Sequence, residues 1–153
     1  ILKAMSEIFI SVVSIIIAAG VFAEGIKALG GIAILGDGIA NLGVSAVILT
    51  ITILSFLVYF FAMIMGSGIA AFNAFGRLAP DIATKLGIAP ITLVLPIEIA
   101  SALGRAASPI AGGILALAGF AKVPPIEIIK RTTPLLLIGM GINILVSWYL
   151  TFL

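Results

Sequence analysis

Residues 101–113, SALGRAASPIAGG, combine a cation, hydroxyl groups and glycines between two apolar runs. Arg105 stands deep in this apolar surrounding, and a charge inside a membrane segment is costly unless it faces a cavity or a partner. Ser108 and Pro109 follow it, and proline interrupts a helix because it has no N–H to donate. An arginine at such an interruption predicts an anion-binding site. The alternatives are a snorkelling arginine and a simple proline kink.

A second interruption, Gly66, Ser67 and Gly68, ends another long apolar run. Interrupted helices can bring half-helix ends together inside a membrane. Their N-terminal ends offer free N–H groups to an anion, whereas C-terminal ends and bare carbonyls suit a cation. We therefore predict one binding site built from 66–68 and 104–109, with Gly104 at the start of the second break. A tight helix contact or a plain turn is the alternative for the Gly-Ser-Gly.

Two further polar side chains lie within reach of these interruptions. Asn73 follows the Gly-Ser-Gly and either reaches the cavity at that tip or hydrogen-bonds a neighbouring helix. Glu98 precedes Arg105 by seven residues, two helical turns on the same face. It is therefore either the ion-pair partner of Arg105 or a cation or proton site.

The composition identifies the class of protein. Of 153 residues, 63% are hydrophobic and 9% charged, with a mean hydropathy of +1.41, whereas soluble domains carry about 25% charged residues. The chain is expected to be an all-α integral membrane protein. It has no cysteine and no histidine, which removes thiolate, zinc-protease and Ser/His chemistry, so no enzyme is expected. The scattered net charge of +2 indicates no nucleic-acid partner.

The first half of the chain predicts a span, an arm and a hairpin. Residues 5–24 are one apolar run and are expected to cross the membrane as a helix. Residues 25–43 are less hydrophobic and rich in glycine, which suits an arm at the membrane interface. Residues 44–86 have a long apolar leg, an uncharged tip at 66–68 and a short second leg. This pattern predicts a re-entrant hairpin, with two ordinary spans as the alternative.

The second half predicts a broken span and a final span. Residues 88–121 open near Pro90, where a proline can begin a helix, and break at 104–109. Residues 122–131 are expected to be a polar connection, and 131–153 form one apolar span. All of 1–153 is then a single transmembrane domain, and its first residue, an isoleucine, suggests a piece of a longer chain.

Three stretches carry a resemblance to a known family: MGSGIAAFNAF at 65–75, LGIAPITLVLPIEIASALGRAASPIAGGILALAGFAKVPPIEIIKRTTP at 86–134 and, more loosely, VVSIIIAAGVFAEGIKALG at 12–30. They resemble the C-terminal half of the anaerobic four-carbon dicarboxylate carriers of the Dcu type (DcuC-like), within the ion transporter superfamily. Ile69 stands where the resemblance places an asparagine. The residues that match the hairpin tip and the broken helix are Gly66, Ser67 and Gly68, and Ser101, Gly104, Arg105, Ser108 and Pro109.

The resemblance implies an architecture. Its members are built from two inverted repeats, each with a re-entrant helical hairpin and a discontinuous transmembrane helix, and the substrate and ion sites form at the tips and breaks. The chain would be the C-terminal repeat, paired with the N-terminal repeat of the same protein. Related transporters are homodimers with an elevator-like movement, so a multi-pass protein of the cell's inner (plasma) membrane, embedded in the lipid bilayer, is implied.

The expected function is secondary transport of a small organic dianion such as succinate, fumarate or malate, by exchange or by coupling to a sodium ion or proton. No other cofactor and no metal is expected. Arg105 and the N–H groups at the breaks would hold a carboxylate, Ser67 and Ser108 would donate hydrogen bonds, and tip carbonyls could hold a cation. A carrier of a different organic anion is one alternative. The other is a non-transporting membrane assembly or scaffold unit, in which the breaks only pack helices.

Overall fold

The computed structural model describes residues 2–30 and 44–151, and this part of the chain is helical throughout, without a strand. The all-α prediction is therefore confirmed for these residues. The predicted arm falls largely on 31–43, which lie outside the described residues. The helices are α1 (Leu2–Ala28), α3 (Val44–Met65), α4 (Gly68–Phe75), the 3-10 turn η1 (Gly76–Leu78), α5 (Ala79–Leu86), α6 (Ile91–Ala106), α7 (Gly112–Ala121) and α8 (Pro125–Leu150).

Two of these helices are long and apolar enough to cross a membrane. The stretch Ala46–Met65 of α3 has 20 residues and a mean hydropathy of 2.6, and α8 has 26 residues with a mean hydropathy of 1.6. A crossing needs about 20 residues, so both qualify by length and composition. Many large apolar side chains also remain on the outside, Phe120 with 87% of its surface exposed among them. The described part is thus suited to a membrane, where such side chains can face lipid.

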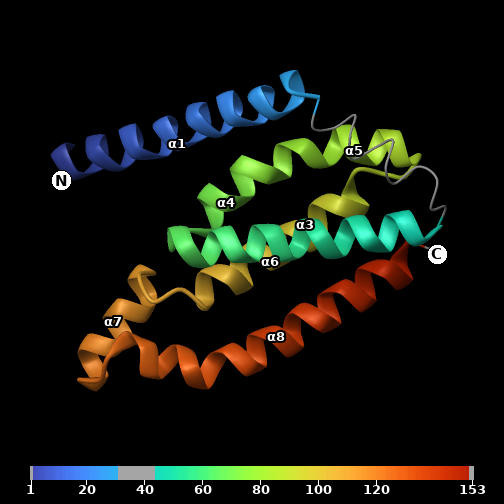
Figure 1. Ribbon diagram of the computed structural model, residues 1–153. Helices are drawn as coiled ribbons and strands as arrows, with labels where there is room; N and C mark the ends of the chain where they lie inside the picture. Colours follow the sequence, from blue (N-terminus) through green and yellow to red (C-terminus); the bar gives the residue numbers. More distant parts are fainter. Residues whose placement is uncertain (1, 31–43, 152–153) are drawn as a thin grey trace.

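Helix α3 lies at the centre and packs against α6, which runs in the same direction, and against α8, which returns (Figure 1). The core between α3 and α6 contains the fully buried side chains of Ile51, Val58, Leu93 and Ile97. At Gly104 the two helices come so close that a Cβ would overlap the backbone carbonyl of Tyr59. A glycine at this position therefore sets the distance between α3 and α6.

At Met65 the chain leaves α3 and turns back on itself. Gly66 has a φ of +66°, a left-handed conformation that favours glycine. Ser67 then caps α4, because its Oγ accepts a hydrogen bond from the N–H of Ala70 at 3.2 Å. Helices α4 and α5 lie beside α3 on the way back (Figure 1), and the rings of Phe61 and Phe75 join the two legs at 4.9 Å.

The break in the second half lies further along than the predicted 104–109. Helix α6 continues through Gly104 and Arg105 to Ala106, and α7 begins at Gly112. The helix ends here because Pro109 has no N–H and disfavours helical geometry in the residue before it. Gly104 does not interrupt the helix, since its missing side chain serves the contact with α3 instead.

Helix α8 begins at Pro125, six residues before the predicted start of the last span. The predicted polar connection is therefore mostly helix. Pro125 occupies the first helical position, where no N–H is needed, and Glu127 in the first turn interacts favourably with the helix dipole. Pro134 lies inside α8 without ending it.

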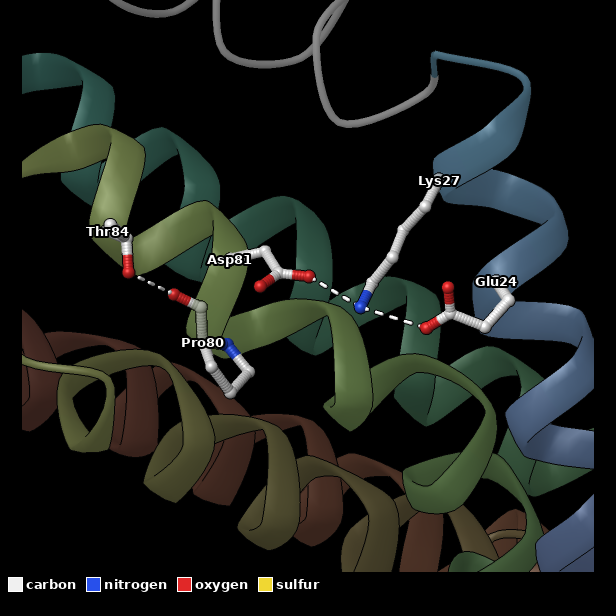
Figure 2. Close-up of polar contacts among 5 residues, drawn as sticks. All are labelled: Glu24, Lys27, Pro80, Asp81 and Thr84. Carbon is white, nitrogen blue, oxygen red and sulfur yellow. Dashed lines mark hydrogen bonds and ion pairs between the residues drawn. The ribbon is translucent and has the colours of Figure 1, made fainter.

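Helix α1 is held against the hairpin near its C-terminal end. The Nζ of Lys27 lies 2.7 Å from Oδ2 of Asp81 in α5 and 3.1 Å from Oε1 of Glu24 in its own helix (Figure 2). The hydrogen bond to Asp81, and then the one to Glu24, raises the pKa of Lys27 above its usual 10.5. Residues 25–28, predicted to start the arm, instead continue α1 as far as the turn at Gly30.

Candidate functional site

The tip at 66–68 lies against residues on either side of the predicted break at 104–109. A Cβ on Gly68 would be 2.9 Å from the carbonyl oxygen of Ser101 and 3.3 Å from its Oγ. A Cβ on Gly66 would be 2.9 Å from Cγ1 of Ile110 and 3.4 Å from the backbone nitrogen of Ala111. The tip of the hairpin therefore sits directly on the break between α6 and α7.

Ser108 organises the break from within and has no exposed surface. Its N–H donates to the carbonyl of Arg105 at 3.1 Å, and its carbonyl accepts from the N–H of Ala111 at 3.4 Å. Its Oγ accepts from the N–H of Ile110 at 3.3 Å, which leaves the hydroxyl hydrogen to be donated. The hydroxyl of Ser101 is already used as a donor, to the carbonyl of Glu98 at 2.8 Å.

Two helices begin where the tip meets the break. Helix α4 is capped by Ser67, and α7 begins after Ala111, whose methyl group cannot cap it. The first N–H groups of a helix have no acceptor within the helix, so those of Gly112 and Gly113 point out of the start of α7. These ends carry a partial positive charge and form a favourable environment for an anion.

Arg105 faces a hollow of about 310 Å³ between the end of α6 and the start of α7. Its side chain is exposed, and the first turn of α7 contributes Gly113 and Ile114 to the same hollow. A fixed guanidinium and a helix N-terminus thus converge on one space. That combination can hold a carboxylate, since guanidinium binds it in a bidentate manner and the N–H groups supply further donors.

Three predicted site residues lie elsewhere. Pro109 is exposed at the break. Glu98 is exposed and, within the described ranges, forms no ion pair with Arg105. Asn73 is half-buried and donates its Nδ2 hydrogen to the carbonyl of Ile69 at 2.9 Å, within its own helix. Of the predicted site residues, Gly66 and Gly68 lie at the contact between tip and break, and Arg105 lines a separate hollow.

Sequence reasoning missed the residues that line this hollow beside Arg105. Ala102 and Ala106 supply its wall from α6, and Gly113 and Ile114 supply it from α7. Alanines in an apolar run carry no signal of their own. The paired glycines at 112–113, directly after a proline break, could have indicated a helix start with an open backbone.

Comparison with known proteins agrees with the family resemblance of the sequence. The profile of the C4-dicarboxylate anaerobic carrier family, DcuC, matches residues 2–151. The chain is 39% identical over 145 residues to the anaerobic C4-dicarboxylate transporter DcuC of Escherichia coli K12, covering 95% of the chain and 31% of that protein. It is 44% identical over 88 residues to the "probable anaerobic C4-dicarboxylate transporter DcuC" of Vibrio cholerae, covering 58% of the chain and 19% of that protein.

The chain spans about a third of the length of the Escherichia coli relative and less of the Vibrio cholerae one. No solved structure matches it.

Proposed function

The chain belongs to the C4-dicarboxylate anaerobic carrier family, and on that premise we propose that it forms a substrate-binding part of a secondary transporter for small dicarboxylates such as succinate, fumarate or malate. The family is one of carriers and not of enzymes. The proposal concerns the whole protein, because the relatives on which it rests are about three times longer than this chain.

One observation carries this function: Arg105 and the first turn of α7 line the same hollow. A dicarboxylate has two anionic ends, and the guanidinium provides the stronger, bidentate contact for one of them. The second end would meet helix N-termini at the contact between tip and break when that contact opens, since Ser108 has no exposed surface in this structure. There, Ser67 and Ser108 each accept a backbone N–H and keep a hydroxyl hydrogen to donate.

We also propose what drives the transport. Transport proceeds by exchange of dicarboxylates or by coupling to a sodium ion or a proton. Carbonyl groups at the tip would be the cation ligands, because unwound backbone carries unpaired acceptors. Glu98 is the only acidic side chain of α6 and lies two turns from Arg105, so it is the proton-carrying candidate.

For the architecture, we propose that α3 with α4 and α5 is a re-entrant hairpin and that α6 and α7 are the two halves of a discontinuous transmembrane helix. The close fit of tip and break supports this, because non-helical backbone in a membrane must be covered by protein or face a water-filled cavity. The N-terminal repeat of the same protein would supply the inverted counterpart. Two copies would form a homodimer of the inner membrane that works by an elevator-like movement.

One observation favours the alternative, a scaffold unit that does not transport. The glycines at 66, 68 and 104 are all needed for close backbone contacts, which explains them without a ligand. Arg105 is not explained in this way, because its side chain is exposed and lines the hollow beside α7. We therefore prefer the carrier.

The test is counterflow of labelled succinate into proteoliposomes that contain the purified protein, with Arg105→Ala beside the wild type. Arg131→Ala is the matched control, since Arg131 is also exposed but lies in the first turns of α8. We expect Arg105→Ala to reduce counterflow by at least about tenfold, the effect of losing one charge-assisted contact of about 1.4 kcal/mol or more, and Arg131→Ala to leave it intact.

Wild-type counterflow in Arg105→Ala would refute the site. Absence of counterflow with succinate, fumarate, malate and aspartate would point to another organic anion or to the scaffold role.

A further inference from the structure

Three buried oxygen atoms lie away from the hollow of Arg105 and have no hydrogen-bond partner among the described residues. They are the Oγ of Ser55, the phenol oxygen of Tyr59 and the Oδ1 of Asn143. These residues are 0%, 7% and 6% exposed. Buried polar atoms are nearly always paired, so three together call for a physical explanation.

The residues that carry these atoms belong to one seam between α3, α6 and α8, Tyr59 and Asn143 by their contacts and Ser55 by its position in α3. Tyr59 of α3 packs in one cluster with Ala100 of α6 and Met140 of α8. Asn143 lies one turn from Met140, and its Nδ2 donates to the carbonyl of Pro96, one turn before Ala100, at 3.0 Å. The amide of Asn143 is thereby oriented, and its oxygen is the end left over.

Ser55 lies on the same seam by its place in the fold. It precedes Tyr59 by one helical turn, so both are on one face of α3. The backbone of Tyr59 lies against Gly104, and α3 and α6 run in the same direction (Figure 1). Ser55 is therefore level with Ala100, between the positions of Tyr59 and Asn143 along α6.

The hydroxyl of Ser55 differs from its neighbours in the same helix. Thr50 and Thr52 each donate to the backbone carbonyl four residues earlier, both at 2.7 Å. This local bond is the usual way for a hydroxyl to be satisfied inside a membrane helix. Ser55 could bond in the same way to the backbone carbonyl four residues before it, but it makes no such bond in the described structure. Its hydroxyl therefore remains available to a partner in the seam.

The chemistry of the seam is that of neutral oxygen ligands. Asn143 offers only lone pairs at Oδ1, and Ser55 and Tyr59 offer lone pairs as well. Because Pro96 has no N–H, the carbonyl of Thr92 also lacks its helical donor. Thr92 and Ser147 line an adjoining hollow of about 230 Å³ together with Pro96. Ser55 and Tyr59 each also carry one O–H donor, so the region combines two free donors with oxygen lone pairs from Ser55, Tyr59, Asn143 and the Thr92 carbonyl.

Such a set of ligands suits a monovalent cation. Hard cations prefer oxygen ligands, and a divalent ion usually takes carboxylates, which compensate its charge. Among the described residues, none of the buried polar side chains is charged.

We propose that the α3–α6–α8 seam binds a sodium ion through Ser55, Tyr59 and Asn143, reached through the hollow beside Thr92 and Ser147. This site is distinct from the tip carbonyls and from Glu98. Its use as a coupling-ion site rests on the transport function proposed above, whereas binding itself does not.

The test is the thermal unfolding of the purified protein in detergent during a titration with sodium chloride, with choline chloride holding the ionic strength constant and no dicarboxylate present. We expect the midpoint to rise with sodium, because a ligand that binds only the folded state stabilises it. Tyr59→Phe and Ser55→Ala each remove one oxygen ligand and should weaken the apparent affinity for sodium by at least about tenfold. Thr52→Val is the matched control, since the hydroxyl of Thr52 is already bonded within α3.

No rise in wild type beyond that in choline would overturn the proposal and leave at most a bound water in the seam. An equal response of wild type, Tyr59→Phe and Ser55→Ala would overturn it as well. Either result leaves the transport proposal untouched, because the titration contains no dicarboxylate. Conversely, lack of succinate counterflow would not remove a sodium-dependent rise.

Discussion

Gly104 and Arg105 are neighbours in the sequence but belong to different parts of the molecule. Consecutive residues of a helix point about 100° apart, so one can face a neighbouring helix while the next faces open space. Gly104 is pressed against the backbone of Tyr59, whereas the side chain of Arg105 lines the hollow beside α7. The glycine thus places α6 against α3, and this contact fixes where the arginine stands.

Gly104→Ala is expected to destabilise the protein, because the new methyl group would meet the carbonyl of Tyr59, and backbone cannot move aside as a flexible side chain can. Overpacking of this kind costs about 1–3 kcal/mol. The measurement is the thermal unfolding midpoint in detergent. Gly119→Ala is the control, since no described atom lies within 4 Å of a Cβ there. Equal midpoints for the two variants would contradict the close contact.

At the scale of the helices, the sequence predicts that breaks exist better than it predicts where they lie. Pro109 indicates a break correctly, but the predicted start at Gly104 is wrong by a turn, because a glycine needed for packing and a glycine that ends a helix look alike in a sequence. The start of α8 was predicted too late because polar residues after Pro125 resemble a loop, although proline and Glu127 are also helix-start signals.

The meeting of tip and break could not be derived from local pattern. Gly68 and Ser101 are far apart in the sequence, and their contact depends on how α3 and α6 align. The expectation that half-helix ends converge came from the chemistry of unpaired backbone in a membrane. The division between this contact and the hollow of Arg105 depends on which face of α6 each residue occupies, and this is visible only once its partner helices are placed.

The attachment of α1 to the hairpin gives a prediction about pH. The pKa of Lys27, which lies beyond the predicted span, is raised by its contacts with Asp81 and Glu24. A raised pKa means that the stabilisation is fully present below pH 10.5 and is lost as the pH rises through the higher folded value. We expect the unfolding midpoint of wild type to fall in that range more steeply than that of Lys27→Met.

Thr84→Ala is the control for this measurement, because the hydroxyl of Thr84 donates to the carbonyl of Pro80 within α5 and is not part of the ion pair (Figure 2). Its pH profile should match that of wild type. Superimposable profiles of wild type and Lys27→Met would show that the ion pair does not hold α1 to α5.

The outer surface of the described helices carries many large apolar side chains. Along α8, Leu135 and Leu145 expose 69% and 62% of their surfaces. Exposed apolar patches of this size mark contact with a membrane or with another protein surface. A membrane protein contacts lipid, and relatives about three times as long as this chain have further segments that could cover the same surface.

The chain has no cysteine, which allows this surface to be tested by single substitutions. Leu145→Cys should react slowly with a water-soluble maleimide in intact membranes, because α8 would hold it in the bilayer or against the rest of the protein. Lys130→Cys, in the early turns of the same helix, should react readily. Equal labelling rates would mean that α8 does not lie within the membrane.

The close packing of the hairpin tip against the break also has an evolutionary consequence. A larger residue at 68 requires the backbone at 101 to move away, and one at 104 requires the same of the backbone at 59, whereas at 66 the nearest atom is the side-chain Cγ1 of Ile110. A different side chain at 101 or 59 would not relieve a clash with backbone, so a larger residue at 68 or 104 must move a whole helix. Natural variants that keep this packing are therefore expected to retain glycine at 68 and 104.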